Sequence, residues 1–152
     1  MAFATIDVTQ TLELTIKIAE SIKNAIKSLH LSRNLDRKLI IRSLLRHCRA
    51  EHPDYNVAIF EPDIAFYPNL KDKIYEEQFE LQDLVRKFKF KIVFFKTGTI
   101  TLLHGLNNAK RWGIFGNIDQ NKTKFIEATN QNIYVFDEPK PDVKYNIVPD
   151  SN

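Results

Sequence analysis

The N-terminal part of the chain shows the hydrophobic spacing of helices. From about residue 9 to residue 29, an apolar residue recurs every three or four positions, which is typical of an amphipathic helix. Asp7 or Thr9 is placed to cap this helix, and the β-forming residues at 2–8 predict a short strand before it. The apolar stripe consists of Ile16, Ala19, Ile22, Ile26 and Leu29.

A second amphipathic helix is predicted after a break at residues 30–34. Ser32 or Asn34 is placed to cap this helix, and Pro53 closes it after about Ala50. The side chains expected to face the core are Leu35, Leu39, Ile41, Leu44, Leu45 and Cys48. Another face carries a basic ridge, which consists of Lys38, Arg42, Arg46 and Arg49.

The clearest strand signal is a strict alternation of lysine with apolar residues at 87–92. The lysine row formed by Lys87, Lys89 and Lys91 should point to one side of the strand, and the apolar residues to the other. Thr97 and Gly98 suit a two-residue turn, so the chain is expected to return over residues 99–103 as a hairpin.

The other segments complete the predicted fold. Residues 56–60 predict a buried strand, and the period of residues 73–88 predicts a third helix with an acidic outer face. Further strand candidates lie at 111–118, 123–128 and 133–136, and the prolines that follow predict an extended or disordered tail. We therefore expect an α+β fold, with N-terminal helices packed on an antiparallel β-meander of four to six strands. One domain would span residues 1–137, and residues 138–152 would form the tail.

The net charge of +3 conceals three blocks of alternating sign. Residues 1–50 hold nine Lys and Arg against four acids, residues 51–85 hold two against nine, and residues 86–152 hold eleven against six. Such blocks either neutralise one another, within the fold or between chains, or create a basic surface for a polyanion. The single cysteine, with no signal-like start and no long apolar run, predicts a cytoplasmic protein outside the membrane.

No pattern in the chain predicts an active site or a cofactor. His47, Glu51 and His52 resemble a zinc-binding helix, but their spacing places the two imidazoles about 140° apart, which does not suit a metal. Cys48 occupies an apolar helix position and is expected to be a core residue. We therefore expect a protein that is not an enzyme and that holds no cofactor and no metal.

Three segments, in chain order, resemble one repeat of the TATA-box-binding protein family. Residues 4–14 are similar to its opening strand and first helix, residues 60–70 to its Tyr-x-Pro and Phe-Pro-Gly-Leu stretch, and residues 92–100 to its Phe-x-x-Gly hairpin. The resemblance implies a curved antiparallel sheet that lies on a DNA minor groove, with Tyr67 and Phe95 as aromatic wedges. The chain departs from the pattern by carrying a single repeat, whereas a saddle needs two, so a homodimer would have to supply the second.

Two functions follow from these patterns. The basic ridge, the lysine row and the resemblance favour a non-enzymatic protein that binds DNA or RNA. The expected nucleic-acid-binding residues are Lys38, Arg42, Arg46, Arg49, Tyr67, Lys87, Lys89, Lys91 and Phe95. The alternative is a homo-oligomeric protein–protein interaction or assembly module, in which the opposite charge blocks and residues 143–148 dock onto a partner. Neither function involves a membrane.

Overall fold

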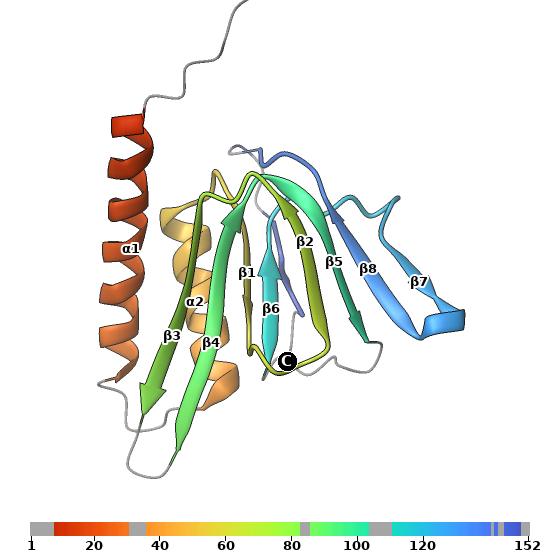
Figure 1. Ribbon diagram of the computed structural model, residues 1–152, viewed down its shortest axis with the longest axis horizontal. Coiled ribbons are helices and arrows are strands. Elements are labelled where there is room, and N and C mark those ends of the chain that lie inside the picture. The colour runs from red at the N-terminus through yellow and green to blue at the C-terminus, as the bar shows by residue number, and fades with distance from the viewer. Residues whose placement is uncertain are drawn as a thin grey trace, which may run out of the picture.

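The computed structural model describes residues 8–30, 36–82, 86–103, 111–140, 142 and 145–149. Within this part of the chain, two helices pack on one face of a five-stranded sheet, and a four-stranded sheet packs on its other face (Figure 1). The helices are α1 (Val8–His30) and α2 (Arg37–Glu51).

Both sheets are antiparallel throughout. The five-stranded sheet contains, in spatial order, β3 (Tyr75–Gln82), β4 (Lys87–Phe95), β1 (Asn56–Phe60), β6 (Trp112–Phe115) and β9 (Ile147–Val148). The four-stranded sheet contains β2 (Phe66–Lys71), β5 (Thr97–Leu103), β8 (Gln131–Phe136) and β7 (Lys124–Ile126), and a 3-10 turn (Glu127–Thr129) joins β7 to β8. The α+β class and the antiparallel sheet are confirmed. The described strands number nine and form two sheets, where the sequence predicted one meander of four to six.

The five-stranded sheet separates two hydrophobic cores. Between this sheet and the helices lie, among others, Ile18, Ile22, Leu44, Leu45, Ile59, Phe90, Ile92 and Phe94. Between the two sheets lie Ala58, Phe60, Phe66, Val93, Phe95, Ile100, Trp112 and Phe136. On β4, Phe88 and Phe90 are buried while Lys87 and Lys89 are exposed, which confirms the predicted facing of this strand.

The helix predicted at residues 73–88 is wrong, because the described part of this segment contains β3 and the start of β4. Phe79 lies opposite Phe90, and their ring centroids are 5.9 Å apart. Tyr75, Phe79 and Leu81 pack on the helix-side core. A separation of four positions suits both a helix and a strand, whereas the separation of two between Phe79 and Leu81 suits one face of a strand only. Burial of this face overrides the helix propensity of the Glu and Gln residues between them.

The hairpin predicted at Thr97 and Gly98 is also wrong. β4 pairs with β3 and β1, whereas β5 pairs with β2 and β8, so the chain leaves one sheet for the other at Lys96. Gly98 has a φ of +141°, and a β-carbon there would collide with the backbone of Asn69 and Leu70. Glycine is needed at position 98 because the backbone of β2 lies so close to it, and not because the chain reverses direction there.

The start of α2 and the buried faces of both helices agree only in part with the sequence predictions. Asp36 caps α2, since its Oδ1 accepts a hydrogen bond from the Leu39 N–H at 2.7 Å. Leu39 itself is exposed, and the neighbouring Ile40 is buried instead. In α1, Ile18 and Ile22 are fully buried, whereas Ile16, expected on the apolar stripe, is 50% exposed.

Other predictions for the helical part are confirmed, are corrected or fall outside the described residues. Ile41, Leu44, Leu45 and Cys48 are buried as expected. The predicted caps Ser32 and Asn34 are corrected, because Asp36 caps α2. Thr9 does not cap α1 either, since α1 begins at Val8, the last residue of the predicted first strand. Asp7, Leu35 and the rest of that strand lie outside the described residues.

The C-terminal strand predictions are confirmed, with narrower bounds for β6 and β7 and with β8 beginning two residues earlier than predicted. Part of the predicted tail also joins the fold, because β9 pairs with β6, with Val148 opposite Ile114. The domain boundary after residue 137 stays a prediction, although the strand beyond it belongs to the five-stranded sheet.

Candidate functional site

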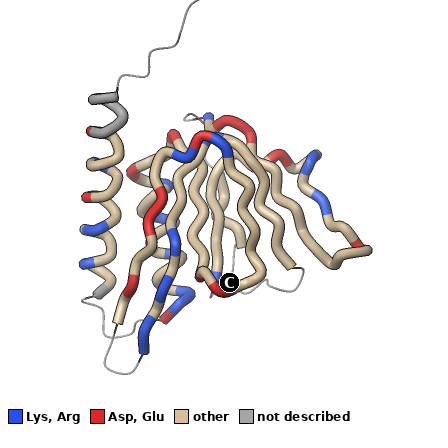
Figure 2. Tube along the Cα trace, viewed as in Figure 1, with Lys and Arg blue, Asp and Glu red and all other residues tan. Residues whose placement is uncertain are grey.

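Basic side chains gather where α2 and β4 both begin. Asp36, Arg37, Lys38, Arg86, Lys87 and Phe88 line a hollow of about 580 Å³, which we call the basic hollow. Its volume is in the range of small-ligand sites. Figure 2 shows Lys and Arg gathered along this end of β4. The described lining holds four cationic side chains and one carboxylate, that of Asp36, which already accepts the Leu39 N–H. Carboxylates outside the lining pair with two of these cations, Glu61 with Arg37 and Glu80 with Lys87.

A neighbouring hollow of about 440 Å³ shares Arg37, Lys87 and Phe88 with the basic hollow. Its remaining lining includes Lys89 and two carboxylates, those of Glu61 and Asp63. The described linings therefore differ in charge: that of the basic hollow holds four cations and one carboxylate, and that of the neighbouring hollow holds three cations and two carboxylates.

Phe88 forms the apolar floor on which the cations of the basic hollow lie. Its ring is 6% exposed and belongs to the helix-side core. The guanidinium carbon of Arg37 lies 5.9 Å from the ring centroid, and that of Arg86 lies 5.5 Å from it. Both distances allow a cation–π interaction, so the ring places the two guanidinium groups at the hollow.

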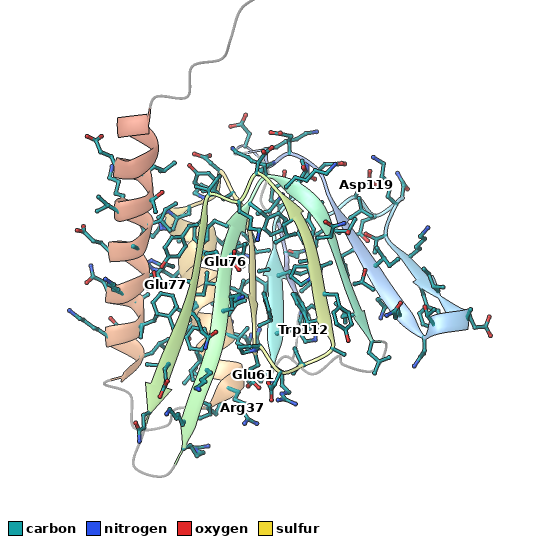
Figure 3. All side chains as sticks on the ribbon, viewed as in Figure 1. Arg37, Glu61, Glu76, Glu77, Trp112 and Asp119 are labelled. Atoms are coloured by element: carbon teal, nitrogen blue, oxygen red, sulfur yellow. The ribbon has the colours of Figure 1, made fainter. Side chains whose placement is uncertain are left out.

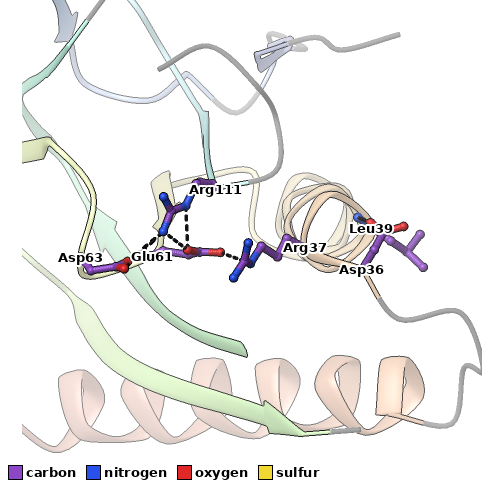
Figure 4. Close-up of polar contacts among 6 residues, drawn as sticks. All are labelled: Asp36, Arg37, Leu39, Glu61, Asp63 and Arg111. Atoms are coloured by element: carbon purple, nitrogen blue, oxygen red, sulfur yellow. Dashed lines mark hydrogen bonds and ion pairs between the residues drawn. The ribbon is translucent and has the colours of Figure 1, made fainter. Parts of the chain in front are cut away.

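A buried carboxylate orients Arg37. The side chain of Glu61 is 9% exposed, and its Oε1 lies 2.9 Å from Arg37 Nε; the two residues are labelled side by side in Figure 3. Glu61 Oε2 accepts a hydrogen bond at 2.9 Å from Nε of Arg111, which also pairs with Asp63 at 3.2 Å (Figure 4). The hydrogen bond to Glu61 raises the pKa of Arg111, with the nearby carboxylates adding to the effect. This network joins the first residue of α2 to the ends of β1 and β6.

The structure brings together three of the predicted nucleic-acid-binding residues. Lys38 and Lys87 line the basic hollow, and Lys89 lines the neighbouring one. Arg42, Arg46 and Arg49 continue along α2 away from it, and Arg49 donates to the carbonyl of Tyr145 at 3.4 Å. The basic ridge therefore meets the basic hollow only at its first member.

The lysine row is partly neutralised by the neighbouring strand. Lys87 pairs with Glu80 at 2.7 Å, and Lys91 pairs with Glu76 at 3.2 Å. Lysines 73 and 91 lower the pKa of Glu76, the hydrogen bond from Lys73 most of all. β3 is the edge strand of this sheet, and its glutamates lie beside the lysine row. The wrong prediction of a helix at 73–88 did not anticipate these ion pairs.

The two predicted wedges have different surroundings. Phe95 is fully buried between the sheets, with its ring centroid 4.9 Å from that of Phe136, so it cannot enter a base step from this position. This corrects its predicted role. Tyr67 is 58% exposed on β2, opposite Thr101 of β5 in the other sheet, and therefore does not belong to the basic hollow.

Sequence reasoning missed Arg37, Arg86 and Glu61. Arg37 directly follows the capping residue Asp36, and Arg86 directly precedes the lysine alternation. The sequence therefore contained local signals for both arginines. It contained no signal that the start of α2 lies near the start of β4, because this proximity depends on how α2 packs across the five-stranded sheet.

A histidine cluster joins the two helices. The Ser21 hydroxyl lies 2.7 Å from Nε2 of His47 and 3.0 Å from Nε2 of His52. Among the described residues, no three His, Cys, Asp or Glu side chains gather closely enough to hold a metal ion. Cys48 is fully buried, and desolvation raises the pKa of its thiol, so it is a packing residue as predicted.

Comparison of the chain with protein-family models, with curated proteins and with solved structures finds no significant match. The resemblance to the TATA-box-binding protein family therefore stays a prediction. None of the described helices is long and apolar enough to cross a membrane. What the basic hollow can bind has to be argued from its own residues.

Proposed function

We propose that this protein binds nucleic acid, with the basic hollow as the principal contact. The observation that carries the proposal is the convergence of Arg37, Lys38, Arg86 and Lys87 on one hollow, in whose described lining the single carboxylate is already engaged as a helix cap. Clustered cations of this kind neutralise phosphates and release counterions, which supplies most of the affinity of non-specific nucleic-acid binding.

The hollow favours phosphate contacts over contacts with bases. A base would need an exposed aromatic face for stacking. Phe88, the aromatic residue in the lining, is 6% exposed and lies under Arg37 and Arg86. Binding should therefore depend strongly on salt and weakly on sequence.

The test is a fluorescence-anisotropy titration with duplex DNA, single-stranded DNA and RNA at about 50 and 200 mM salt. The double variant Lys38→Ala/Arg86→Ala should weaken binding to every sequence. For the duplex, the slope of log K against log salt should fall by about 0.9 for each phosphate that the variant no longer neutralises. Arg46→Ala/Arg49→Ala, on the outer part of the basic ridge, should have a smaller effect. Lys124→Ala on β7 is the control.

Two results would overturn the proposal. The first is an affinity weaker than about 10⁻⁴ M at low salt for all three ligands, which is below ordinary non-specific binding. The second is an equal loss of affinity in the hollow variant and in Arg46→Ala/Arg49→Ala, which also removes two charges, because this would mean that net charge alone matters.

A second candidate function is self-association through the outer face of the four-stranded sheet. β5 and β8 contain no charged residue, as Figure 2 shows, and Tyr67 and Leu103 are 58% and 42% exposed on this face. The uncharged middle strands of this sheet can meet those of a second copy without opposing like charges. Sedimentation equilibrium of the protein and of Tyr67→Lys decides this: a dimer that the substitution dissociates would support the assembly function, and a monomer would exclude it.

A further inference from the structure

The three members of the lysine row differ in their ion pairs. Lys87 pairs with Glu80 at 2.7 Å, and Lys91 pairs with Glu76 at 3.2 Å. Lys89 lies between them on β4, opposite Glu80, whose carboxylate is already engaged by Lys87. Lys89 is exposed and, within the part of the chain that the structure describes, has no acidic partner. One lysine of the row is therefore available to an outside anion.

The neighbouring hollow gives such an anion a defined place beside Lys89. β1 ends at Phe60, which lies opposite Lys91, so residues 87–90 of β4 extend past the end of β1. The hollow lies beside this extension, and its lining joins the start of β4 to the residues that follow β1. Gln78 of β3 also lines it, and the side-chain amide of Gln78 has no hydrogen-bond partner among the described residues. Lys89 and Gln78 thus offer two uncommitted donors to one hollow.

The carboxylates of the neighbouring hollow are already paired. Glu61 meets Arg37 with Oε1 and Arg111 with Oε2, and Asp63 accepts Nη2 of Arg111 on both oxygens (Figure 4). The two arginines therefore balance the two acids, and the other lysine of the lining is neutralised by its own ion pair. Among the described groups, Lys89 supplies the one positive charge that remains in excess.

We propose that Lys89 binds an internal phosphate of the nucleic acid at the neighbouring hollow, on the same strand that the basic hollow contacts. This inference rests on the proposed function. The two hollows share Arg37, Lys87 and Phe88, so one strand can pass from the first to the second. An internal phosphodiester carries a single negative charge, which matches the single charge in excess. The amide N–H groups of Gln78 can donate to a phosphate oxygen and so fix its position.

The test compares two lysines of the same strand and the same row. Lys89→Ala removes the unpaired charge, whereas Lys91→Ala removes a charge that Glu76 already neutralises. Both substitutions lower the net charge by one, so each is the matched control of the other. In anisotropy titrations with duplex DNA, Lys89→Ala should lower the slope of log K against log salt by about 0.9 and weaken binding about threefold or more at about 50 mM salt. Lys91→Ala should change both clearly less, and Lys89→Arg, which keeps the charge, should bind like the natural chain.

The outcomes separate this inference from the proposed function. Equal effects of Lys89→Ala and Lys91→Ala, or an unchanged salt slope in Lys89→Ala, would overturn the role of Lys89. The proposed function would then still stand if Lys38→Ala/Arg86→Ala weakens binding. If Lys89→Ala weakens binding and the double variant does not, Lys89 keeps its role and the basic hollow is not the principal contact. If none of these variants changes binding, both proposals are overturned.

Discussion

The side chain of Asn56 fills the space beside Gly116. A β-carbon on Gly116 would collide with Asn56 Oδ1, and Gly116 has a φ of +145°. Asn56 is fully buried, and its Nδ2 donates to the carbonyls of Lys96 at 2.6 Å and Asp137 at 3.0 Å. Its Oδ1 accepts the Asn117 N–H at 2.8 Å. One amide therefore joins the segments that follow β4, β6 and β8.

Replacing this amide should destabilise the protein strongly. Asn56→Ala leaves two carbonyls and one N–H without their partner, so we expect the free energy of unfolding to fall by about 3 kcal/mol or more. Gly116→Ala should act in the same direction through strain and collision. Urea unfolding measures both, with Asn69→Ala on the exposed side of β2 as the matched control. A loss as small as that of the control would contradict the role given to Asn56.

Adjacent residues of α2 should differ widely in their contribution to stability. Leu45 is fully buried, and its Cδ1 occupies the space that a β-carbon on Gly113 of β6 would need. Leu45→Ala should therefore cost about 2–5 kcal/mol. Arg46 is exposed, and Arg46→Ala should cost less than about 1 kcal/mol. Thermal unfolding of the two variants makes the comparison, and similar shifts would mean that α2 is rotated from the orientation described.

The two arginines on Glu61 should also differ in stability. Arg37→Ala leaves Glu61 bonded to Arg111, so we expect a loss of about 1 kcal/mol or less. Arg111→Ala removes both contacts of Arg111 with the buried Glu61 and its contact with Asp63, leaving Glu61 with Arg37 alone, and should cost about 1.5–3 kcal/mol. Urea unfolding of each variant gives the values. If Arg37→Ala is the more damaging change, Arg37 is structural and does not belong to a phosphate site.

Stability should fall in mild acid because of the histidine cluster. Burial, together with the neighbouring His47, lowers the pKa of His52 from its ordinary value of 6.5, and Glu51 opposes this effect. Because the pKa of this imidazole is lower in the folded chain than in the unfolded chain, the unfolded chain binds the proton more readily. Its contribution to stability is therefore complete above about pH 6.5 and is lost as the pH falls through the folded-state pKa.

The measurement is urea unfolding between about pH 7.5 and pH 5, above the range in which most carboxylates titrate. His52→Gln keeps a hydrogen-bonding group near Ser21 but cannot take up a proton in this range. This variant should show a shallower pH dependence than the natural chain. Parallel curves would assign the dependence to other groups.

β4 shows how much of the fold was present in the sequence. Its first half alternates Lys and Phe, which predicted correctly which side faces the helices. From Ile92 to Phe95, by contrast, four apolar residues follow one another, and all four are buried. Such a run is typical of a strand covered on both faces, and it signals the second sheet. The pairing partners of β4 and β5 were not predictable, because alternation defines faces and not neighbours.

The candidate site was predictable to a similar degree. Lys38, Lys87 and Lys89 were expected to bind nucleic acid and do lie at the two hollows. Arg37 joins them only because Glu61, far away in the sequence, holds it there. Phe95 was expected at the surface from a motif, yet the second sheet covers it. In each case the decisive contact is tertiary, and no local pattern encodes it.

The crossing at Lys96 is one of six among the described strands, because the chain passes from one sheet to the other at β1–β2, β2–β3, β4–β5, β5–β6, β6–β7 and β8–β9. Any break in the chain between β2 and β8 divides both sheets at once. Neither sheet is therefore a separate folding unit, although each side of the central sheet has its own core. The protein should unfold in a single cooperative transition. It should also fold slowly, over milliseconds to seconds, because most of its strand partners are distant in the chain.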